Sequence, residues 1–427
     1  MPAGAWITNM AANKIEEMAK RARQASRKLA SCPSCAKNAF LARLADLLKA
    51  ETGEILAINA IDYENAEKAG MGRAKLNRLM LTPQIVANLE KACLEIAAMD
   101  DPVGATETQW QRPNGLLVGK MRIPLGVIAM IYEARPNVTI DAAILCIKAG
   151  NAIILRGGKE ALETNRFLCS LLRKALEDAD LPADGAQLVE DVDHSVIDEL
   201  CGMDEYIDVM IPRGGENLIA KVCAKAKMQV LKHYRGVCHV YIDEDADIEQ
   251  ALAIVINGKT QRPGVCNALE GVLVNDKIAP AFLPALSEKM AAAHVELRAC
   301  ARALPFLGAE AVLQKPEDRG REFLDLVLAV NIVDDMEEAV DAIECYGSRH
   351  TEIICTRNYG RALRFLREVD ASMVGVNAST RFNDGGELGL GAEIGISTSK
   401  IHAYGPMGLK ELTTTKFVVL GNGQIRE

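Results

Sequence analysis

One cysteine of this 427-residue chain stands in a setting that suits a reactive thiol. Cys266 follows a Pro263-Gly264 break, and the residues running on through Leu269 read as the start of a new segment. A break followed by a helix start leaves backbone N–H groups without a partner, and their dipoles favour a thiolate over a thiol. A thiol is only a few per cent ionised at neutral pH, so this help matters for a nucleophile. The pattern predicts Cys266 as the reactive centre.

The ordinary structural role of cysteine is the competing interpretation. The chain has 12 Cys, and a free cysteine is commonly a small buried hydrophobe. Cys32 and Cys35 form a CxxC pair, but no second pair follows at zinc spacing. The six histidines are isolated from acidic residues at metal spacing, and His402 alone lies near a glycine-rich stretch. No metal site is therefore predicted.

Two turns, each between an apolar strand and a helix, carry paired glycines. Glycine lets the backbone approach a ligand closely, and a helix N-terminus attracts anions. Neither turn is a full GxGxxG, and paired glycines also occur as plain turn residues. Two such turns in one parallel sheet, each with an arginine, nevertheless favour a dinucleotide. The candidate cofactor-binding residues are Arg156, Gly157, Gly158, Lys159, Arg213, Gly214 and Gly215.

The charge of the first turn bears on which dinucleotide binds. Rossmann sites usually place an acidic residue on the adenosine ribose hydroxyl. Here the turn offers Arg156 and Lys159 instead, and basic side chains suit a 2′-phosphate. The sequence therefore predicts NADPH/NADP rather than NAD, although Lys159 is equally compatible with a solvated surface lysine.

Two further segments are rich in hydrogen-bond donors. Arg135 offers a fixed fork for phosphate or carboxylate, and Asn137 suits either a helix cap or an oxyanion donor. A cap and a surface arginine explain that segment equally well. Ser379, Thr380 and Arg381 lie between a strand and a glycine-rich loop, where they suit a charged amino-acid substrate.

The pattern of apolar residues predicts an α/β protein of more than one domain. Residues 11–50 have helical periodicity, and Asn114-Gly115 between strand-like runs predicts a hairpin over 101–123. Buried strands alternate with helices from 126 to 227, which is typical of a parallel sheet covered on both faces. A second strand and helix series follows, and the tail is rich in β-formers.

Composition limits the possible partners and location. The net charge of −9 argues against nucleic-acid or membrane-surface binding. Scattered cysteines and the absence of a secretory signal predict a reducing, cytoplasmic compartment. No run of 18 apolar residues predicts a membrane span.

Taken in order, the motifs resemble the aldehyde dehydrogenase superfamily, and within it the enzymes that reduce γ-glutamyl phosphate. The likeness runs from about residue 11 to the tail. The matching stretches are Ile123–Ile128, Tyr132–Asn137, Lys148–Asn151, Leu155–Gly158, Ile211–Gly214, the Cys266 segment, Asn377–Phe382 and Leu388–Glu393.

The resemblance implies an aldehyde dehydrogenase-like α/β fold in three parts. A Rossmann-like parallel-sheet cofactor domain is expected over 1–102 and 122–255, and an α/β catalytic domain over 256–385. A β-hairpin oligomerisation element is expected over 103–121 with a tail over 396–427. Exposed strands need a partner edge, so a homodimer or a dimer-based tetramer is expected.

The resemblance also implies a chemistry: NADPH-dependent reduction of L-glutamate 5-phosphate to the 5-semialdehyde with phosphate release, the second step of proline biosynthesis from glutamate. Cys266 would form a thioester, with Asn137 and the Cys266 N–H meeting the oxyanion. Transient contact with glutamate 5-kinase is plausible chemically, because an acyl phosphate is unstable. The implied remaining roles are Arg135 and Arg262 for the phosphate, Ser379, Thr380 and Arg381 for the α-carboxylate, and Glu322 for the nicotinamide ribose.

One departure from the wider superfamily discriminates between activities. Hydrolytic members carry a Glu-Leu-Gly-Gly motif whose glutamate activates water, and the corresponding stretch here is His233-Tyr234-Arg235-Gly236. The missing carboxylate favours a reductase over oxidation of a free semialdehyde to an acid. A cofactor-free cysteine hydrolase leaves the glycine turns without a purpose, and a non-catalytic scaffold leaves the Cys266 setting unexplained.

Overall fold

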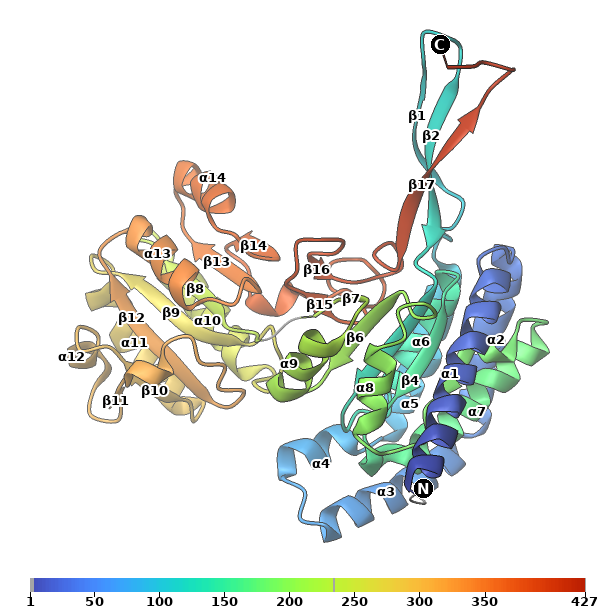
Figure 1. The fold of residues 1–427 in the computed structure, drawn as a ribbon. Helices are drawn as coiled ribbons and strands as arrows, with labels where there is room; N and C mark the ends of the chain where they lie inside the picture. The colour runs from blue at the N-terminus through green and yellow to red at the C-terminus, as the bar shows by residue number, and fades with distance from the viewer. Residues whose placement is uncertain (1–3, 233–234, 427) are drawn as a thin grey trace. The chain divides into compact units, whose positions relative to one another are not determined.

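The computed structural model describes residues 4–232 and 235–426 and divides into two compact units (Figure 1). Unit 1 comprises Met1–Lys232, Gly389–Gly395 and Met407–Glu427, and unit 2 comprises His233–Leu388 and Ile396–Pro406. The first boundary therefore follows Lys232, and not residue 255 as the sequence suggested. The reason is that the strand after residue 235 pairs within the second sheet.

Unit 1 is built on a five-stranded parallel sheet in the order β5-β4-β3-β6-β7. β3 and β4 are buried at every position, as strands covered on both faces must be. The order is that of a doubly wound sheet, because the chain moves outward from β3 to β5 and then returns to β3's other side. The strands are β3 (Val127–Tyr132), β4 (Ala152–Arg156), β5 (Ala186–Leu188), β6 (Val209–Arg213) and β7 (Gln229–Val230).

Helices cover both faces of this sheet. α6 and α7 contact each other and the strands that they connect, while α1 contacts β3, β4, β5 and α8. α2 packs on α5 and α7 as an outer layer. The helices are α1 (Gly4–Leu29), α2 (Ser34–Ala50), α3 (Thr52–Lys68), α4 (Arg73–Leu79), α5 (Pro83–Ala98), α6 (Val138–Lys148), α7 (Leu162–Asp178), α8 (Ser195–Cys201) and α9 (Glu216–Lys225).

The expected hairpin and the tail strand form one antiparallel sheet that projects from unit 1 (Figure 1). β1 (Thr106–Gln111) pairs with β2 (Leu117–Pro124), and β17 (Thr413–Leu420) pairs with β2 over its whole length. Gly115 has φ +87, and its N–H donates to the Arg112 carbonyl at 2.9 Å to close the turn. The Asn-Gly prediction of a hairpin is thus confirmed in this structure.

A buried asparagine joins the projecting sheet to the core of unit 1. The Asn151 amide donates to the Leu412 carbonyl at 2.9 Å, and its side-chain oxygen accepts from the Gly126 N–H at 2.8 Å. Gly150 precedes it with φ +79, and a side chain there would place Cβ 2.7 Å from Pro124. The turn after α6 is therefore packed against the end of β2 and the start of β17, at the base of the projecting sheet.

Unit 2 contains a seven-stranded parallel sheet in the order β11-β10-β12-β9-β8-β13-β14. β8 lies near the middle, which explains why residues 235–255 belong to this unit. A two-stranded antiparallel pair, β15 with β16, completes it. The strands are β8 (Cys238–Ile242), β9 (Leu269–Asn275), β10 (Glu296–Ala299), β11 (Val312–Leu313), β12 (Val327–Val333), β13 (Thr351–Cys355), β14 (Met373–Val376), β15 (Ile396–Ser397) and β16 (Gly405–Pro406).

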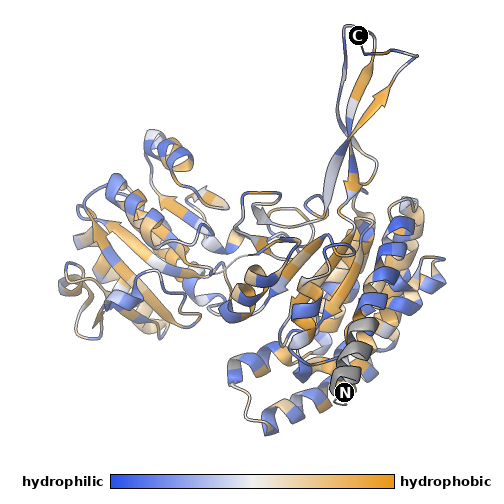
Figure 2. Ribbon diagram, in the orientation of Figure 1, coloured by the Kyte–Doolittle hydropathy of each residue, from blue (hydrophilic) through white to orange (hydrophobic). Residues whose placement is uncertain are grey.

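Alternate residues of this sheet enter two separate cores. Val240 and Val272 lie in the cluster shared with α10 and α11, whereas Tyr241 and Leu273 lie in the cluster shared with α13 and α14. The strands are accordingly among the most apolar parts of the chain (Figure 2). The helices are α10 (Ile248–Thr260), α11 (Ala279–Ala292), α12 (Leu304–Leu307), α13 (Met336–Tyr346) and α14 (Tyr359–Glu368).

Within residues 4–232 and 235–426, no helix is both long and apolar enough to cross a membrane.

Replacing Asn151 by alanine is expected to lower the free energy of unfolding by about 2–4 kcal/mol. The buried Leu412 carbonyl would lose its partner at about 1–3 kcal/mol, and the partly buried Gly126 N–H would lose its partner at about 1 kcal/mol. Urea unfolding followed by circular dichroism measures the change. The matched control is Asn88→Ala on the exposed side of α5, expected within about 0.5 kcal/mol of wild type. Equal effects of both substitutions would contradict the role given to Asn151.

Candidate active site

Cys266 lies in a turn of unit 2 between the end of α10 and the start of β9. The segment that follows it is a strand, so the helix N-terminus expected from the sequence is not there. A helix dipole is therefore not what activates this thiol. Cys266 is partly exposed, and it stands at the amino end of β9, where the turns that precede the neighbouring strands also gather.

Backbone packs directly on backbone behind Cys266. A Cβ on Gly236 would lie 2.5 Å from the Cys266 Cα and closer still to the Cys266 carbonyl oxygen. The Gly236 N–H donates to Glu322 at 2.9 Å, and the buried Cys238 thiol donates to the Cys266 carbonyl at 3.2 Å. Cys266 thus has a fixed wall made of the segment before β8 and of Glu322.

In hydrolytic enzymes the stretch that corresponds to residues 233–236 carries the water-activating carboxylate. Arg235 and Gly236 are the described residues of the corresponding stretch, and neither is acidic. His233 and Tyr234 lie outside the described residues.

Two guanidinium groups share the electrostatic surroundings of the thiol. Burial lowers the pKa of Arg381, and the charge of Arg262 acts in the same direction, while Asp384 and Cys266 oppose it. Arg381 Nε donates to the Gln261 side chain at 2.8 Å, which ties it to the turn that carries Cys266. Arg262 lies in the Cys266 turn and Arg381 is bonded to the start of that turn, so both predicted substrate-binding residues belong to the region of the thiol.

The two hydroxyl residues predicted beside Arg381 are placed differently. Thr380 is completely buried, and the Ser379 hydroxyl accepts from the Arg381 N–H at 3.3 Å. Ser379 therefore caps the turn that presents Arg381, and contact of the two hydroxyl groups with a substrate stays a prediction. Burial of a hydroxyl depends on what packs over it, which the local sequence does not reveal.

Sequence reasoning overlooked Asn267. This buried residue follows Cys266, and its amide donates to the Asn383 carbonyl at 2.9 Å and to the Arg381 carbonyl at 3.4 Å. These hydrogen bonds connect the turn that carries Cys266 to the turn that carries Arg381. Its position beside the predicted nucleophile was the only available signal.

The predicted anion turns lie at the carboxyl edge of the sheet in unit 1. β3 and β6 are neighbours at the point where the strand order reverses, which is where doubly wound sheets bind ligands. Gly215 precedes α9, and its N–H donates to the Glu133 carboxylate at 3.3 Å. A Cβ on Gly214 would lie 2.7 Å from the Leu218 side chain and 2.9 Å from that of Glu133, so glycine lets both side chains close over the turn.

The turn after β4 is equally tight. Cβ atoms on Gly157 and Gly158 would collide with Asn165 and Glu160. Arg156 is 6% exposed and donates to the carbonyls of Gly157 at 3.2 Å and Val192 at 2.9 Å. Arg156 therefore supports the turn from inside, and Lys159 is its exposed cation. The turn leads into a short 3-10 helix, Lys159–Ala161, before α7 begins.

Asn137 stands at the same edge of unit 1, at the start of α6. It makes no side-chain cap; its amide donates to Asp141 at 2.8 Å. Burial raises the pKa of Asp141 to about 6, against the opposing effects of this hydrogen bond and of the Arg213 charge. The helix-cap alternative is therefore wrong, and the Asn137 amide is oriented by Asp141. Arg135 is partly buried two residues earlier.

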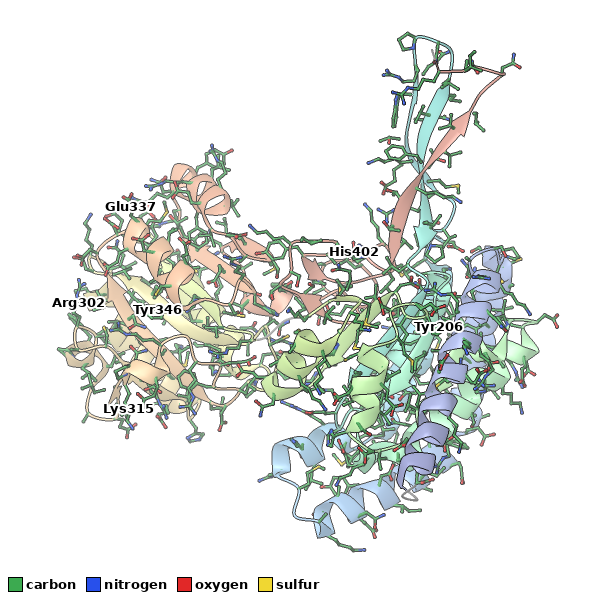
Figure 3. The ribbon with its side chains drawn as sticks, in the orientation of Figure 1. Tyr206, Arg302, Lys315, Glu337, Tyr346 and His402 are labelled. Atoms are coloured by element: carbon green, nitrogen blue, oxygen red, sulfur yellow. The ribbon has the colours of Figure 1, made fainter. Side chains whose placement is uncertain are left out.

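No group of three or more His, Cys, Asp or Glu suited to a metal occurs in the described part of the chain. His402, singled out in the sequence, is exposed between β15 and β16 and has φ +75 (Figure 3).

Comparisons with known proteins agree with these features. A sequence model of the aldehyde dehydrogenase family matches residues 3–300. The γ-glutamyl phosphate reductase of Nitratidesulfovibrio vulgaris strain DP4 is 62% identical over 416 residues, which are 97% of this chain and 99% of that protein. That of Desulfotalea psychrophila is 54% identical, covering 96% of this chain and 98% of its own length.

Solved structures show the same relationship. The γ-glutamyl phosphate reductase of Thermotoga maritima superposes with a TM-score of 0.94 at 42% identity, covering 97% of this chain and 100% of that one. An acetylating aldehyde dehydrogenase of Geobacillus thermoglucosidasius shares the fold, with a TM-score of 0.69 at 19% identity and 99% coverage of both chains.

Gly236→Ala is expected to slow alkylation of Cys266 by iodoacetamide at least about tenfold. The new Cβ has no space beside the Cys266 backbone, and overpacking of this kind displaces the wall at a cost of about 1–3 kcal/mol. Peptide mass spectrometry measures the rate. Gly53→Ala in α3, where a Cβ meets nothing within 4 Å, is the control and should leave it unchanged. A wild-type rate in Gly236→Ala would show that the wall does not hold the thiol.

Proposed function

The chain belongs to the aldehyde dehydrogenase family and, within it, to the γ-glutamyl phosphate reductases, and we propose that it reduces L-glutamate 5-phosphate to L-glutamate 5-semialdehyde with NADPH. Phosphate is released, and the reaction is the second step of proline biosynthesis from glutamate. The observation that carries this proposal is Cys266, which lies in a turn with Arg262 and next to Arg381, whose Nε donates to Gln261 at the start of that turn. An acyl phosphate brings a carbon for the thiolate and negative charge for the guanidinium groups.

The first half of the reaction uses residues of unit 2. The Cys266 thiolate attacks C5 of the acyl phosphate, the bond from C5 to the phosphate oxygen breaks, and a thioester with Cys266 remains. Arg262 attracts the leaving phosphate, and Arg381, tied to Gln261, binds the α-carboxylate. Arg135 of unit 1 is a further candidate for the phosphate.

Charge that develops on the carbonyl oxygen needs hydrogen-bond donors. We assign this role to the Cys266 backbone N–H and to the Asn137 amide. The hydrogen bond from Asn137 to Asp141 supports the assignment, because it restricts the amide before any substrate binds. Ionisation of Asp141, whose pKa burial raises to about 6, strengthens this hydrogen bond.

The carboxyl edge of unit 1 fits a dinucleotide. A Cβ on Gly214, Gly157 or Gly158 would come within 3 Å of a neighbouring side chain, so glycine leaves room for those side chains and keeps the backbone open to a phosphate. We propose that both glycine turns hold the cofactor's phosphates, with Arg213 beside one turn and Arg156 supporting the other. Glu322 is proposed to hold the nicotinamide ribose. When bound, the reduced nicotinamide supplies the hydride that converts the thioester carbonyl into the aldehyde.

Thioester hydrolysis would waste the activated substrate. The stretch that carries the catalytic glutamate in hydrolytic relatives contains no carboxylate here, at positions 233–236. A thioester on Cys266 therefore lacks the usual base for its hydrolysis, which supports reduction over the production of an acid.

The projecting sheet supports self-association. Trp110 on β1 packs edge to face against Phe417 on β17, and Phe417, Val419 and Leu420 are all more than half exposed. Such apolar side chains on strands are typical of an interface. We propose a homodimer or a dimer-based tetramer built on this sheet. A cytoplasmic location is proposed as well, supported by twelve free thiols.

Cys266→Ser is expected to lose at least about 1000-fold in turnover while it still binds NADPH, because only the thiolate forms the thioester. The assay follows NADPH oxidation and phosphate release together, which should be equal in the wild type. Cys345→Ser, an exposed thiol of α13, is the control and keeps full activity. Near-normal turnover of Cys266→Ser would remove the nucleophile, and acid formation without phosphate would indicate oxidation of a free semialdehyde instead.

Lys159→Glu is expected to weaken NADPH binding about 10–150-fold and NADH binding by less than about threefold. A charge-assisted bond to the 2′-phosphate is worth about 1.5–3 kcal/mol and is lost only for NADPH. Fluorescence titration with both nucleotides measures it. Lys174→Glu, at an exposed lysine of α7, is the control and should leave the affinities for NADPH and for NADH unchanged. An equal loss for NADPH and NADH in Lys159→Glu would exclude phosphate recognition by Lys159.

A further inference from the structure

An ion pair closes the base of the turn that carries Cys266. Lys259 lies at the end of α10 and Glu270 at the start of β9, eleven positions apart, and Lys259 Nζ lies 2.8 Å from Glu270 Oε2. Their side chains are 0% and 1% exposed. Arg262 and Cys266 both lie between them, so the pair fixes the two ends of the segment that holds the nucleophile.

The same carboxylate reaches the wall behind Cys266. Glu270 Oε1 accepts from the Leu324 N–H at 3.1 Å. Leu324 is two residues beyond Glu322, which accepts from Gly236. Gly236 in turn packs on the Cys266 backbone. Cys266 is therefore connected to the ion pair along its own turn and, independently, through the segment 322–324.

Stability alone does not account for this pair. Two buried charges lose their hydration, and an apolar pair of similar volume is often as stable or more stable. The desolvation is visible here: burial raises the pKa of Glu270 to about 7 and lowers the pKa of Lys259. The charge of Glu322 also raises the Glu270 pKa. Asp325 and Cys238 raise the pKa of Lys259, against the effect of burial. A role in fixing local geometry is the alternative to a role in stability.

We propose that Lys259 and Glu270 are positioning residues, whose ion pair holds the Cys266 turn and its Gly236 wall in the arrangement that makes the thiol reactive. This inference rests on Cys266 being the nucleophile of the proposed function. It assigns to the buried pair a role in reactivity that is separate from holding the fold together.

The test compares charge removal at this pair with charge removal at a matched pair in unit 1. The double variant Lys259→Met, Glu270→Gln removes both charges and leaves no buried charge alone. The control is Lys37→Met, Asp101→Asn, since Lys37 is 0% exposed and Lys37 Nζ lies 2.9 Å from Asp101. The full chain is treated with iodoacetamide, and Cys35 and Cys345, both exposed, serve as internal references.

The expected result is that Cys266 alkylation slows at least about fivefold in the Lys259, Glu270 double variant, with the two reference thiols unchanged. The control double variant stays within about twofold of wild type at Cys266. An unchanged or faster Cys266 in the first variant, measured where its unfolding curve shows it folded, would overturn the proposal. Alkylation needs neither substrate nor cofactor, so a failure of the proposed reductase activity would be seen separately.

The pH dependence separates positioning from a purely structural role. Below a pH of about 7 Glu270 is protonated and the wild type resembles a single Glu270→Gln variant, whereas above it the carboxylate forms the ion pair. The ratio of the wild-type alkylation rate to that of the single Glu270→Gln variant should therefore approach one on the acid side and rise through about pH 7. A ratio that does not change with pH would contradict the role of the ionised pair.

The contribution of Glu270 to stability should change with pH in the direction opposite to the alkylation rate. Because the folded-state pKa of Glu270 lies above its ordinary value of 4.5, ionisation of this group costs more in the folded chain. Its contribution to the free energy of unfolding falls as the pH rises from about 4.5 to about 7. Reactivity that rises with pH while this stability contribution falls is a combination that a merely structural ion pair would not produce.

Discussion

The thiol site depends on close packing between two backbone segments, Gly236 and the turn that carries Cys266. The Gly236 Cα approaches the Cys266 turn so closely that no side chain fits between them. Contacts made by backbone atoms hold a position more firmly than contacts made by long side chains, since fewer bonds can rotate. The remaining polar contacts of this region, from Cys238, Glu322 and Asn267, converge on the same turn. Cys266 is thereby fixed by packing rather than by a helix dipole.

The two parallel sheets present their chemistry at opposite edges. In unit 1 the candidate residues follow the carboxyl ends of β3, β4 and β6, the usual position for ligands in a doubly wound sheet. In unit 2 Cys266 precedes β9, and Gly236 precedes β8, so the thiol site lies at the amino ends. The anion-binding turns therefore use helix starts and glycine, whereas the thiol site is built by loops that pack on one another.

Local signals predicted the fold class, the hairpin and the two glycine turns, and they singled out Cys266 as the candidate nucleophile. Each depends on neighbouring residues: Asn114-Gly115 on turn geometry, Gly214-Gly215 on close approach, and Pro263-Gly264 on a break in the chain. The continuation after Cys266 was misjudged because a short apolar run does not distinguish helix from strand. The domain boundary was predicted wrongly for a similar reason, since the sequence pattern of an apolar strand such as β8 is the same whichever sheet it joins.

The sequence by itself determined the chemical inventory and its order along the chain, because motif residues act through local backbone geometry. Tertiary structure alone decided which polar groups face a ligand and which are buried. From the sequence, Thr380 and Arg156 look like binding residues. In the structure Thr380 is completely buried, and Arg156 donates to backbone carbonyl groups. In the sequence Lys259 and Glu270 look like ordinary charged residues. They are buried together only because β9 runs back beside α10. Burial is a property of what surrounds a residue in space, so no local pattern reports it.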